Sequence, residues 1–382
     1  MRVVAVTGEP SGDLIASDAI AQFMGTNPTA EVAGIGGDRL KQIGMDCWFT
    51  SDDLAVRGYV EALSKLVHIL AVRYWLLEYV EKWGPGLYLG VDAPDFNLSV
   101  EARLRAKGIR TLHLISPSIW AWRPERISAI QRSVDHMLCI FPFEPQVYAG
   151  TGVRATYVGH PLADAIPMIS DAKAARAALG IHSTRPVVCV MPGSRIGEIR
   201  HNASAFFGAA RQLAASNTVI IPTASIAIER RIRQHPDFAG LEEAGVRLLT
   251  QPIEAPPVSH QAMAACDVAL VASGTATLEV ALHQRPMVIA YRVPAITYAL
   301  MKRRALISDI GLPNILLGER VVPELVQERA NANELTKAVR QWLDHPARCS
   351  EVVERFTQLH EQLRCNAALR IAEMIHDDYR RG

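Results

Sequence analysis

Two carboxylates and one arginine of the sequence stand in glycine- or proline-containing turns that follow short apolar runs. Glu9 lies in the first such turn, Asp95 follows the apolar run 87–91, and Arg195 follows a Pro-Gly-Ser turn. A carboxylate can remove the proton of an attacking hydroxyl group, and a guanidinium can neutralise a departing phosphate. These residue types predict transfer of a group from a phosphate leaving group to a hydroxyl acceptor.

The stretch 268–282 combines an apolar run, a Ser/Gly/Thr turn and an apolar helical pattern, which predicts a strand, a tight loop and a helix. The first backbone N–H groups of such a helix have no partner within it, and the helix dipole favours an anion such as a diphosphate there. Glu279 follows within the first turns, where a carboxylate can accept from a ribose diol. A βα turn with a threonine cap and no ligand is the alternative. The residues expected to bind diphosphate are Ser194, Arg195, Ser273, Gly274, Thr275, Ala276 and Thr277.

The loop 92–97 carries the candidate base. Pro94 and Phe96 are expected to shield Asp95 and raise its pKa toward the range that suits a general base. Asp92 is expected to hold the turn and Asn97 to cap a helix, with a contact to the acceptor also assigned to Asn97. Glu9 is expected to accept a hydrogen bond from a sugar hydroxyl, because a carboxylate would repel a phosphate; a solvated loop acid is the alternative.

Aromatic and basic residues follow the next apolar run. Two tryptophans and two arginines surround a proline-rich turn, where they can stack on a sugar ring and hold an acceptor phosphate. They are Trp120, Trp122, Arg123 and Arg126. Tryptophans that cap the core are the alternative.

The region 54–83 is more apolar than one helical stripe and has interspersed basic and aromatic residues, which fits contact with acyl chains or a membrane surface. Helices packed under the sheet are the alternative there. The expected acyl contacts are Leu63, Val67 and Leu70.

The elements that must position these residues form two series of alternating apolar runs and helical patterns, which predicts an α/β protein with parallel sheets. The length of 382 residues suits two domains. We expect an N-terminal domain over 1–165, a second domain over 166–345, and a C-terminal helix, 346–382, that packs back on the first. The expected strands are 3–6, 31–35, 87–91, 111–115, 138–140, 156–158, 187–190, 218–221, 246–249, 268–271 and 287–290.

Composition excludes several function classes. Forty Lys and Arg residues against 39 Asp and Glu leave a net charge of +1, so no global field for nucleic acid is expected. The six cysteines have no CxxC spacing, which favours reduced thiols over a disulfide framework or a zinc site. The sequence contains no Asp-x-Asp motif, and we expect neither a metal nor a cofactor. It has no signal peptide or membrane-spanning run, so a cytoplasmic location is expected.

Seven motifs occur in an order that resembles the lipid-A-disaccharide synthase family of GT-B glycosyltransferases over nearly the whole chain. They are Gly8–Asp13, Val91–Asn97, Ser116–Arg123, Val158–Leu162, Pro192–Arg195, Ser273–Glu279 and Leu312–Asn314. The resemblance implies the GT-B fold, with two Rossmann-like domains facing a central cleft. It also implies metal-independent, inverting condensation of UDP-2,3-diacylglucosamine with 2,3-diacylglucosamine 1-phosphate (lipid X), which gives a β-1′,6-linked disaccharide 1-phosphate and UDP in lipid A synthesis.

The resemblance also implies roles for individual residues. Asp95 would be the base, and Glu9 would orient the acceptor or support the base; which of the two takes the proton is left open. Arg195 and the 273–277 turn would stabilise departing UDP, Glu279 would bind the ribose, and Asn314 and Gln327 would line the donor site. The protein would bind peripherally to the cytoplasmic leaflet of the inner membrane of a Gram-negative cell, where a homodimer that exchanges C-terminal tails is an option.

Two other functions remain open at this point. Another UDP-sugar enzyme of the same fold, such as a UDP-N-acetylglucosamine 2-epimerase or a peptidoglycan-type transferase, would have a similar donor loop. A soluble epimerase would not need the apolar region 54–83. A nucleotide-sugar-binding protein without turnover is the third reading, and the presence of Glu9, Asp95 and Arg195 in one chain argues against it.

Overall fold

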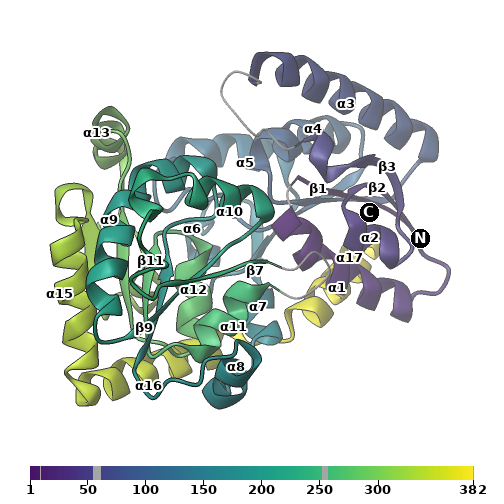
Figure 1. Cartoon of the computed structure of the whole chain (residues 1–382). Helices are drawn as coiled ribbons and strands as arrows, with labels where there is room; N and C mark the ends of the chain where they lie inside the picture. Colours follow the sequence, from purple (N-terminus) through teal and green to yellow (C-terminus); the bar gives the residue numbers. More distant parts are fainter. Residues whose placement is uncertain (9, 55–61, 252–256, 382) are drawn as a thin grey trace. The chain divides into compact units, whose positions relative to one another are not determined.

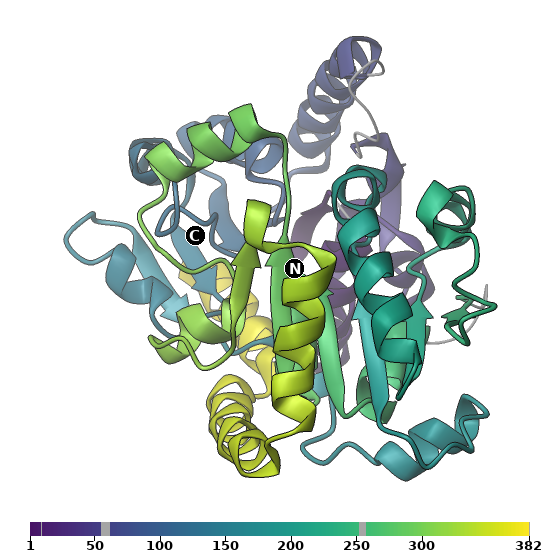
Figure 2. The same cartoon turned by 60° about the vertical axis from the view of Figure 1, so that its left-hand side comes forward.

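The chain folds into two α/β units. The structure, a computed structural model, describes residues 1–8, 10–54, 62–251 and 257–381, and at 10–11 and 62–66 it describes the backbone alone. One unit comprises Met1–Asp164 and Leu363–Gly382, and the other comprises Ala165–Gln362. Each unit contains one parallel sheet covered by helices, as Figures 1 and 2 show.

The first unit has a parallel sheet of seven strands within the described residues, in the order β3-β2-β1-β4-β5-β6-β7. These strands are β1 (Arg2–Thr7), β2 (Glu31–Gly36), β3 (Asp46–Thr50), β4 (Leu87–Val91), β5 (Arg110–Leu114), β6 (His136–Cys139) and β7 (Arg154–Tyr157). The helices are α1 (Pro10–Thr26), α2 (Asp38–Gln42), α3 (Ala62–Trp83), α4 (Pro94–Ala106), α5 (Ile127–Ser133), α6 (Glu144–Val147), α7 (Pro161–Ala165, across the unit boundary) and α17 (Ala367–Arg381), with short 3₁₀ helices at Ser51–Asp53 and Pro124–Arg126.

The second unit has a parallel sheet of six strands within the described residues, in the order β10-β9-β8-β11-β12-β13. These strands are β8 (Val187–Met191), β9 (Thr218–Pro222), β10 (Arg247–Leu249), β11 (Val268–Ala272), β12 (Met287–Tyr291) and β13 (Glu324–Val326). The helices are α8 (Ala172–Ala178), α9 (Ile196–Ala214), α10 (Ile226–Arg233), α11 (Val258–Ala265), α12 (Thr275–Leu282), α13 (Ala295–Arg304), α14 (Leu312–Leu317), α15 (Ala332–Leu343) and α16 (Pro346–Leu363), with 3₁₀ helices at Pro236–Phe238 and Gln327–Arg329.

Both sheets follow the doubly wound order, in which the chain starts at a central strand, proceeds to one edge and then returns to fill the other side. The direction reverses between β1 and β4 in the first unit and between β8 and β11 in the second. Loops at the carboxyl ends of two adjacent strands diverge at such a point, which leaves room for a ligand. Four of the seven sequence motifs, Gly8–Asp13, Val91–Asn97, Pro192–Arg195 and Ser273–Glu279, directly follow the strands at these two points.

The apolar runs form buried strands, as their composition predicted. In the second unit β8, β9 and β11 are almost completely buried, and α9 covers them with the predicted stripe that includes Ile199, Phe206 and Phe207. The structure adds two strands to those expected. β3 is a half-exposed edge strand, and β13 has three residues, so neither has the continuous buried run that identifies the others.

The final helix returns to the first unit, as predicted. α17 packs against α1, and its Asp378 is completely buried. The carboxylate of Asp378 accepts hydrogen bonds from Arg110 at 2.9 Å and from the ring of His136, which lie on β5 and β6. Burial acts to raise the pKa of Asp378, but the hydrogen bonds from His136 and Arg110 lower it to about 2. α16 belongs almost entirely to the second unit.

Candidate active site

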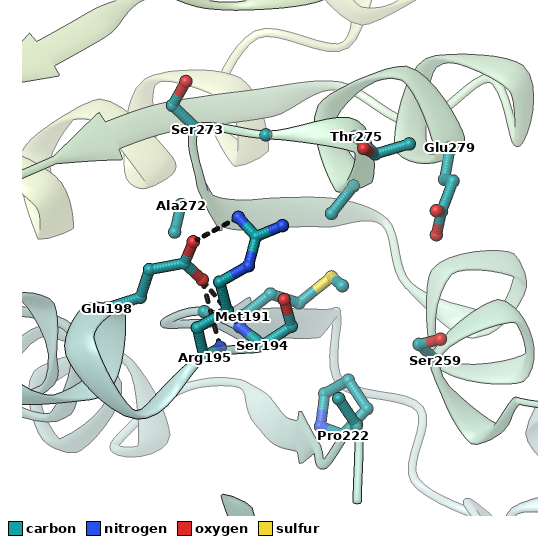
Figure 3. A pocket seen from close by; sticks show the side chains of 14 residues that line it. Met191, Ser194, Arg195, Glu198, Pro222, Ser259, Ala272, Ser273, Thr275 and Glu279 are labelled. Atoms are coloured by element: carbon teal, nitrogen blue, oxygen red, sulfur yellow. Dashed lines mark hydrogen bonds and ion pairs between the residues drawn. The ribbon is translucent and has the colours of Figure 1, made fainter. Parts of the chain in front are cut away.

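One pocket of the second unit lies at the point where the strand order reverses. It has a volume of about 260 Å³, and Figure 3 shows its side chains from close by. Its walls come from the loops after β8, β9 and β11 and from the helices that follow. The lining residues are Met191, Gly193, Ser194, Arg195, Glu198, Pro222, Ala224, Ser259, Ala272, Ser273, Gly274, Thr275, Ala276 and Glu279.

Arg195 extends from the loop after β8 toward the turn that carries Ser273 and Thr275 (Figure 3). The loop is held by Glu198, whose carboxylate accepts from the backbone N–H groups of Ser194 at 2.9 Å and Arg195 at 3.3 Å. The guanidinium also lies 3.5 Å from Glu198 and is otherwise exposed. It is therefore positioned at the pocket wall and still available to an anion.

The amino end of α12 forms the opposite wall. Gly274 precedes the helix and has a φ angle of 153°. Residues with a side chain rarely adopt this backbone conformation, so a glycine here allows the chain to turn from β11 into α12. The N–H of Thr277 is already bonded to the carbonyl of Gly274 at 3.1 Å. Thr275 and Ala276 line the pocket at the start of the helix, where the positive end of the dipole favours a negative group.

Glu279 lines the same pocket from the second turn of α12. Burial of its side chain disfavours the charged form and raises its pKa to about 7. A carboxyl group with that pKa is partly protonated near neutral pH. It can accept hydrogen bonds from hydroxyl groups when ionised.

Several residues expected at the donor site have internal partners. Ser273 donates its hydroxyl to the carbonyl of Ile310 at 2.7 Å, and Thr277 donates to the carbonyl of Gly274 at 2.8 Å. Asn314 is completely buried and bonds to the backbone of 321–322 and to Glu324. The carboxamide of Gln327 bonds twice to the backbone of Val293. Of these, only Ser273 lines the pocket, whereas the expectation placed Thr277, Asn314 and Gln327 there as well.

A second pocket lies in the first unit. It has a volume of about 490 Å³ and is formed by the loops after β4 and β5 and by the 3₁₀ helix Pro124–Arg126. It is lined by Asp92, Pro94, Asp95, Ile115, Ser116, Pro117, Ser118, Ile119, Trp122, Arg123 and Arg126. The structure therefore brings together Asp95, Arg123 and Trp122, which the sequence had placed in two separate loops.

Asp95 lies at the mouth of this pocket and is paired with the guanidinium of Arg126. The expectation that Pro94 and Phe96 shield the carboxylate is wrong, because the side chain of Asp95 is 85% exposed. Phe96 instead points into the core. The exposed carboxylate of Asp95 therefore has oxygen atoms that can accept hydrogen bonds from a ligand.

The aromatic residues after β5 differ in their roles. Trp122 is exposed, and the guanidinium of Arg123 stacks 4.0 Å from the centre of its ring. Trp120 instead packs edge-on against Phe143, and its ring N–H donates to Glu144 at 3.2 Å. Trp120 therefore supports the core, which was the alternative reading, while Trp122 and Arg123 face the pocket.

Asn97 is completely buried, and this corrects the expected contact with the acceptor. Its amide N–H donates to the carbonyl of Asp92 at 2.8 Å, and its carbonyl accepts from the hydroxyl of Tyr88 at 2.8 Å. Asp92 and Ala93 have positive φ angles of 51° and 44°, which are unfavourable for residues with a side chain. Asn97 holds this strained turn, which positions Asp95 at the pocket.

The apolar region after residue 54 is described from α3 onward. α3 buries Val72, Leu76 and Val80 in the core of the first unit, which agrees in part with the reading as a packed helix. Five large apolar side chains of α3 are exposed. Val67, Leu70 and Tyr74 lie on the side opposite to the buried one, and Trp75 and Tyr79 lie on a flank, where Tyr79 also stacks on Trp48. Leu63 and Glu9 lie outside the described side chains.

Arg126, expected with Arg123 to hold an acceptor phosphate, instead pairs with the candidate base. Two further residues at the pockets were not expected. Glu198 holds the arginine loop, and Ser259 lines the donor-side pocket from α11. Glu198 follows Arg195 by three residues at the start of a helix, a spacing typical of a capping residue, so its contribution was visible in the sequence. The position of Ser259 depends on the packing of a distant helix, and no local signal marks it.

Comparison with known proteins gives consistent results. The sequence model of a family described as lipid-A-disaccharide synthetase matches residues 3–375. Lipid-A-disaccharide synthase of Verminephrobacter eiseniae (strain EF01-2) is 44% identical over 98% of this chain and 96% of its own length. The enzyme of the same name from Albidiferax ferrireducens (strain ATCC BAA-621 / DSM 15236 / T118) is 46% identical over 95% of this chain and 93% of its own length.

Among solved structures, the chain is similar to UDP-GlcNAc 2-epimerase from Neisseria meningitidis, bound to UDP-GlcNAc. The match covers the full length of both chains, with a TM-score of 0.62 and 12% identity. That likeness concerns the fold alone, and the predicted GT-B fold class is confirmed.

Proposed function

The chain belongs to the family of lipid-A-disaccharide synthases and is a glycosyltransferase of lipid A biosynthesis, and we propose that it condenses UDP-2,3-diacylglucosamine with 2,3-diacylglucosamine 1-phosphate. The 6-hydroxyl oxygen of the acceptor attacks C1 of the donor sugar. The bond from C1 to the diphosphate oxygen breaks, and UDP leaves with the electron pair. The acceptor proton passes to a base, and attack opposite to the leaving group gives the β-1′,6 linkage with inversion at C1.

The observation that carries this proposal is the pocket formed by Arg195 and the amino end of α12. Two separate sources of positive potential, a guanidinium and a helix dipole, face the same space at a strand-order reversal. Negative charge develops on the diphosphate as the C1–O bond breaks, and fixed positive groups stabilise that charge without reorganisation. Arg195 and α12 would then neutralise the leaving group in a reaction that needs no metal, and Glu279 would bind the ribose.

On the acceptor side, Asp95 is the proposed base. Its exposed carboxylate can reach a bound hydroxyl group, and the ion pair with Arg126 holds the side chain at the pocket. Arg123 and Trp122 face the same pocket and would bind the acceptor phosphate and sugar ring. Glu9 would orient the acceptor or take the proton in place of Asp95.

The proposed substrates carry acyl chains, which leads to a proposed membrane contact. Of the helices in the described part of the chain, none is long and apolar enough to span a bilayer. The exposed side chains of Val67, Leu70, Tyr74, Trp75 and Tyr79 on α3 include aliphatic and aromatic groups, as interfacial helices do. We propose peripheral binding of these side chains to the cytoplasmic face of the inner membrane, where the acyl chains of both substrates are anchored.

A homodimer is a further part of the proposal. α17 follows the Leu363–Asn366 turn and returns to the first unit, where Asp378 has partners on three strands. Exchange of α17 between two copies would retain these contacts. Size determination of the purified protein in detergent tests this point, and a monomer at all concentrations would refute it.

The reaction is tested with purified protein in detergent micelles that contain both acylated substrates and EDTA. Disaccharide formation by the wild type is expected, with a loss of about 10²–10⁴-fold in kcat for Asp95→Asn, the range typical of removing a general base. Glu125→Gln, an exposed acid on the adjacent 3₁₀ helix, serves as the matched control. A folded wild type that forms no disaccharide, or that needs a divalent metal, would refute the proposed reaction; UDP-N-acetylglucosamine is then tested for epimerisation.

A further inference from the structure

Helix α13 of the second unit lacks a buried side. None of its ten residues, Ala295–Arg304, is buried, and Figures 1 and 2 both show it apart from the sheet of its unit. Ile296 is 78% exposed, and Leu300 and Met301 are each 54% exposed. Ile296 and Leu300 are four residues apart and share one side of the helix, and Met301 lies roughly 100° further around it. Large apolar side chains grouped in this way on a helix are a sign of an interaction surface.

The charge of the same segment is uniform. Residues 292–308 contain Arg292, Lys302, Arg303 and Arg304 and no acidic residue. Three of these cations follow one another at the carboxyl end of α13, directly after Leu300 and Met301. The segment therefore combines exposed apolar side chains with a formal charge of +4, counted over these four residues.

Hydrogen bonds fix both ends of this segment within the second unit. At the start, the carboxamide of Gln327 bonds to Val293 at 2.9 and 3.0 Å. After its end, Ser273 donates to the carbonyl of Ile310 at 2.7 Å, and Glu324 accepts from the N–H of Ile310 at 2.8 Å. Because Ser273 lines the donor-side pocket, the carboxyl end of the segment is held next to that pocket.

We propose that α13 is a docking surface for an anionic lipid bilayer, with Ile296, Leu300 and Met301 inserted among the lipids and Lys302–Arg304 bound to anionic headgroups. An apolar face beside a cluster of cations has the composition of an interfacial helix. A second copy of the chain is a less suitable partner, because a symmetric contact would place four cations against four cations. Docking here would bring the donor pocket to the surface in which the donor's acyl chains are anchored; this consequence rests on the proposed function, whereas the docking itself does not.

Binding is measured by flotation with two kinds of vesicle, phosphatidylcholine alone and phosphatidylcholine with phosphatidylglycerol in equal parts. Each cation near an anionic surface changes affinity about fivefold, so Lys302→Gln/Arg303→Gln/Arg304→Gln is expected to weaken binding to the anionic vesicles by roughly a hundredfold. The control variant Lys173→Gln/Lys337→Gln/Arg340→Gln removes the same charge from exposed positions on α8 and α15. Its affinity for the anionic vesicles is expected to stay within about threefold of the wild-type affinity. Ile296→Ser/Leu300→Ser/Met301→Ser is expected to weaken binding to both kinds of vesicle.

Hydrogen exchange of the peptide 295–306 supplies a local measurement on the whole chain. The amides of this peptide should exchange more slowly when anionic vesicles are present. The comparison is made at protein concentrations over which exchange without vesicles is constant, and slower exchange under these conditions supports the proposal. Unchanged exchange of 295–306, or equal vesicle binding by the two charge variants, overturns it. Protection that depends on protein concentration without vesicles indicates self-association and also overturns it. Activity in detergent micelles reports the proposed reaction separately, and the α13 variants are expected to retain it.

Discussion

Glu279→Gln provides a direct test of the donor site. Burial raises the pKa of Glu279 to about 7, so its carboxyl group changes charge within the range in which the enzyme can be assayed. If the carboxylate accepts hydrogen bonds from the donor's ribose hydroxyls, the protonated form binds the donor less well. The donor KM of the wild type should therefore rise as the pH falls through 7, while the variant, which cannot ionise, should show no such change.

The size of the effect follows from the ionised fraction. With a pKa of about 7, roughly 90% of Glu279 is ionised at pH 8 and roughly 10% at pH 6. A hydrogen bond to a charged group contributes about 1.5–3 kcal/mol, or more than tenfold in affinity, so ionisation limits binding over this interval. The donor KM should rise about ninefold from pH 8 to pH 6 in the wild type. In Glu279→Gln it should be high at both values.

The assay is donor KM at saturating acceptor in detergent micelles from pH 6 to pH 8. Acceptor saturation is necessary because a phosphate monoester itself titrates near pH 6. Asp95→Asn is the control, since its carboxylate lies in the other unit and its loss should lower kcat without removing the pH dependence of donor KM. A flat wild-type profile, or the same ninefold rise in Glu279→Gln, would refute the role assigned to Glu279.

Substitutions at three other residues have defined outcomes. Arg195→Gln should lower kcat/KM by about 10²–10³-fold, measured in the micelle assay, because it removes a fixed donor to the leaving group; an unchanged value would exclude that role. Asn97→Ala should lower kcat while leaving donor KM unchanged, since it releases the turn that positions Asp95. Asn97→Asp keeps an acceptor for the hydroxyl of Tyr88 but cannot donate to the carbonyl of Asp92, so it should not recover kcat. Asp378→Asn should lower the free energy of unfolding by about 2 kcal/mol in urea titrations at pH 7. The pKa of Asp378 is lower in the folded protein than in the unfolded chain, so its carboxylate stabilises the fold only while it is ionised. The difference between variant and wild type should therefore disappear as the pH falls from 4 toward 2.

The strands could be predicted from the sequence because each is a short apolar run. Val268–Ala272 is buried along its whole length, as the run predicted, and the turn that follows opens α12. The half-exposed β3 and the three-residue β13 were not expected, since an edge strand pairs on one side only and a short strand has too few residues to show a pattern. Their places are decided by the neighbours β2 and β12.

The candidate site was predictable where a loop directly follows a strand. Arg195 and Gly274 converge because β8 and β11 are parallel neighbours, so their carboxyl ends meet at one edge although about 80 residues separate them. Side-chain directions were not predictable in the same way. Asn97 points inward to a strained turn, and Asp95 points outward to Arg126, although the two lie in the same turn of α4.

The internal hydrogen bonds of the second unit change the account of how it would bind a diphosphate. The hydroxyls of Ser273 and Thr277 are donated to backbone carbonyls, so they are not free to donate to a ligand. The leaving group would then be bound by the backbone N–H groups at the start of α12 and by Arg195, whose loop is held by Glu198. Such donors are fixed before the donor binds, so little reorganisation opposes their interaction with the developing charge. The hydroxyl groups that suggested ligand binding in the sequence act instead by fixing the geometry that the binding requires.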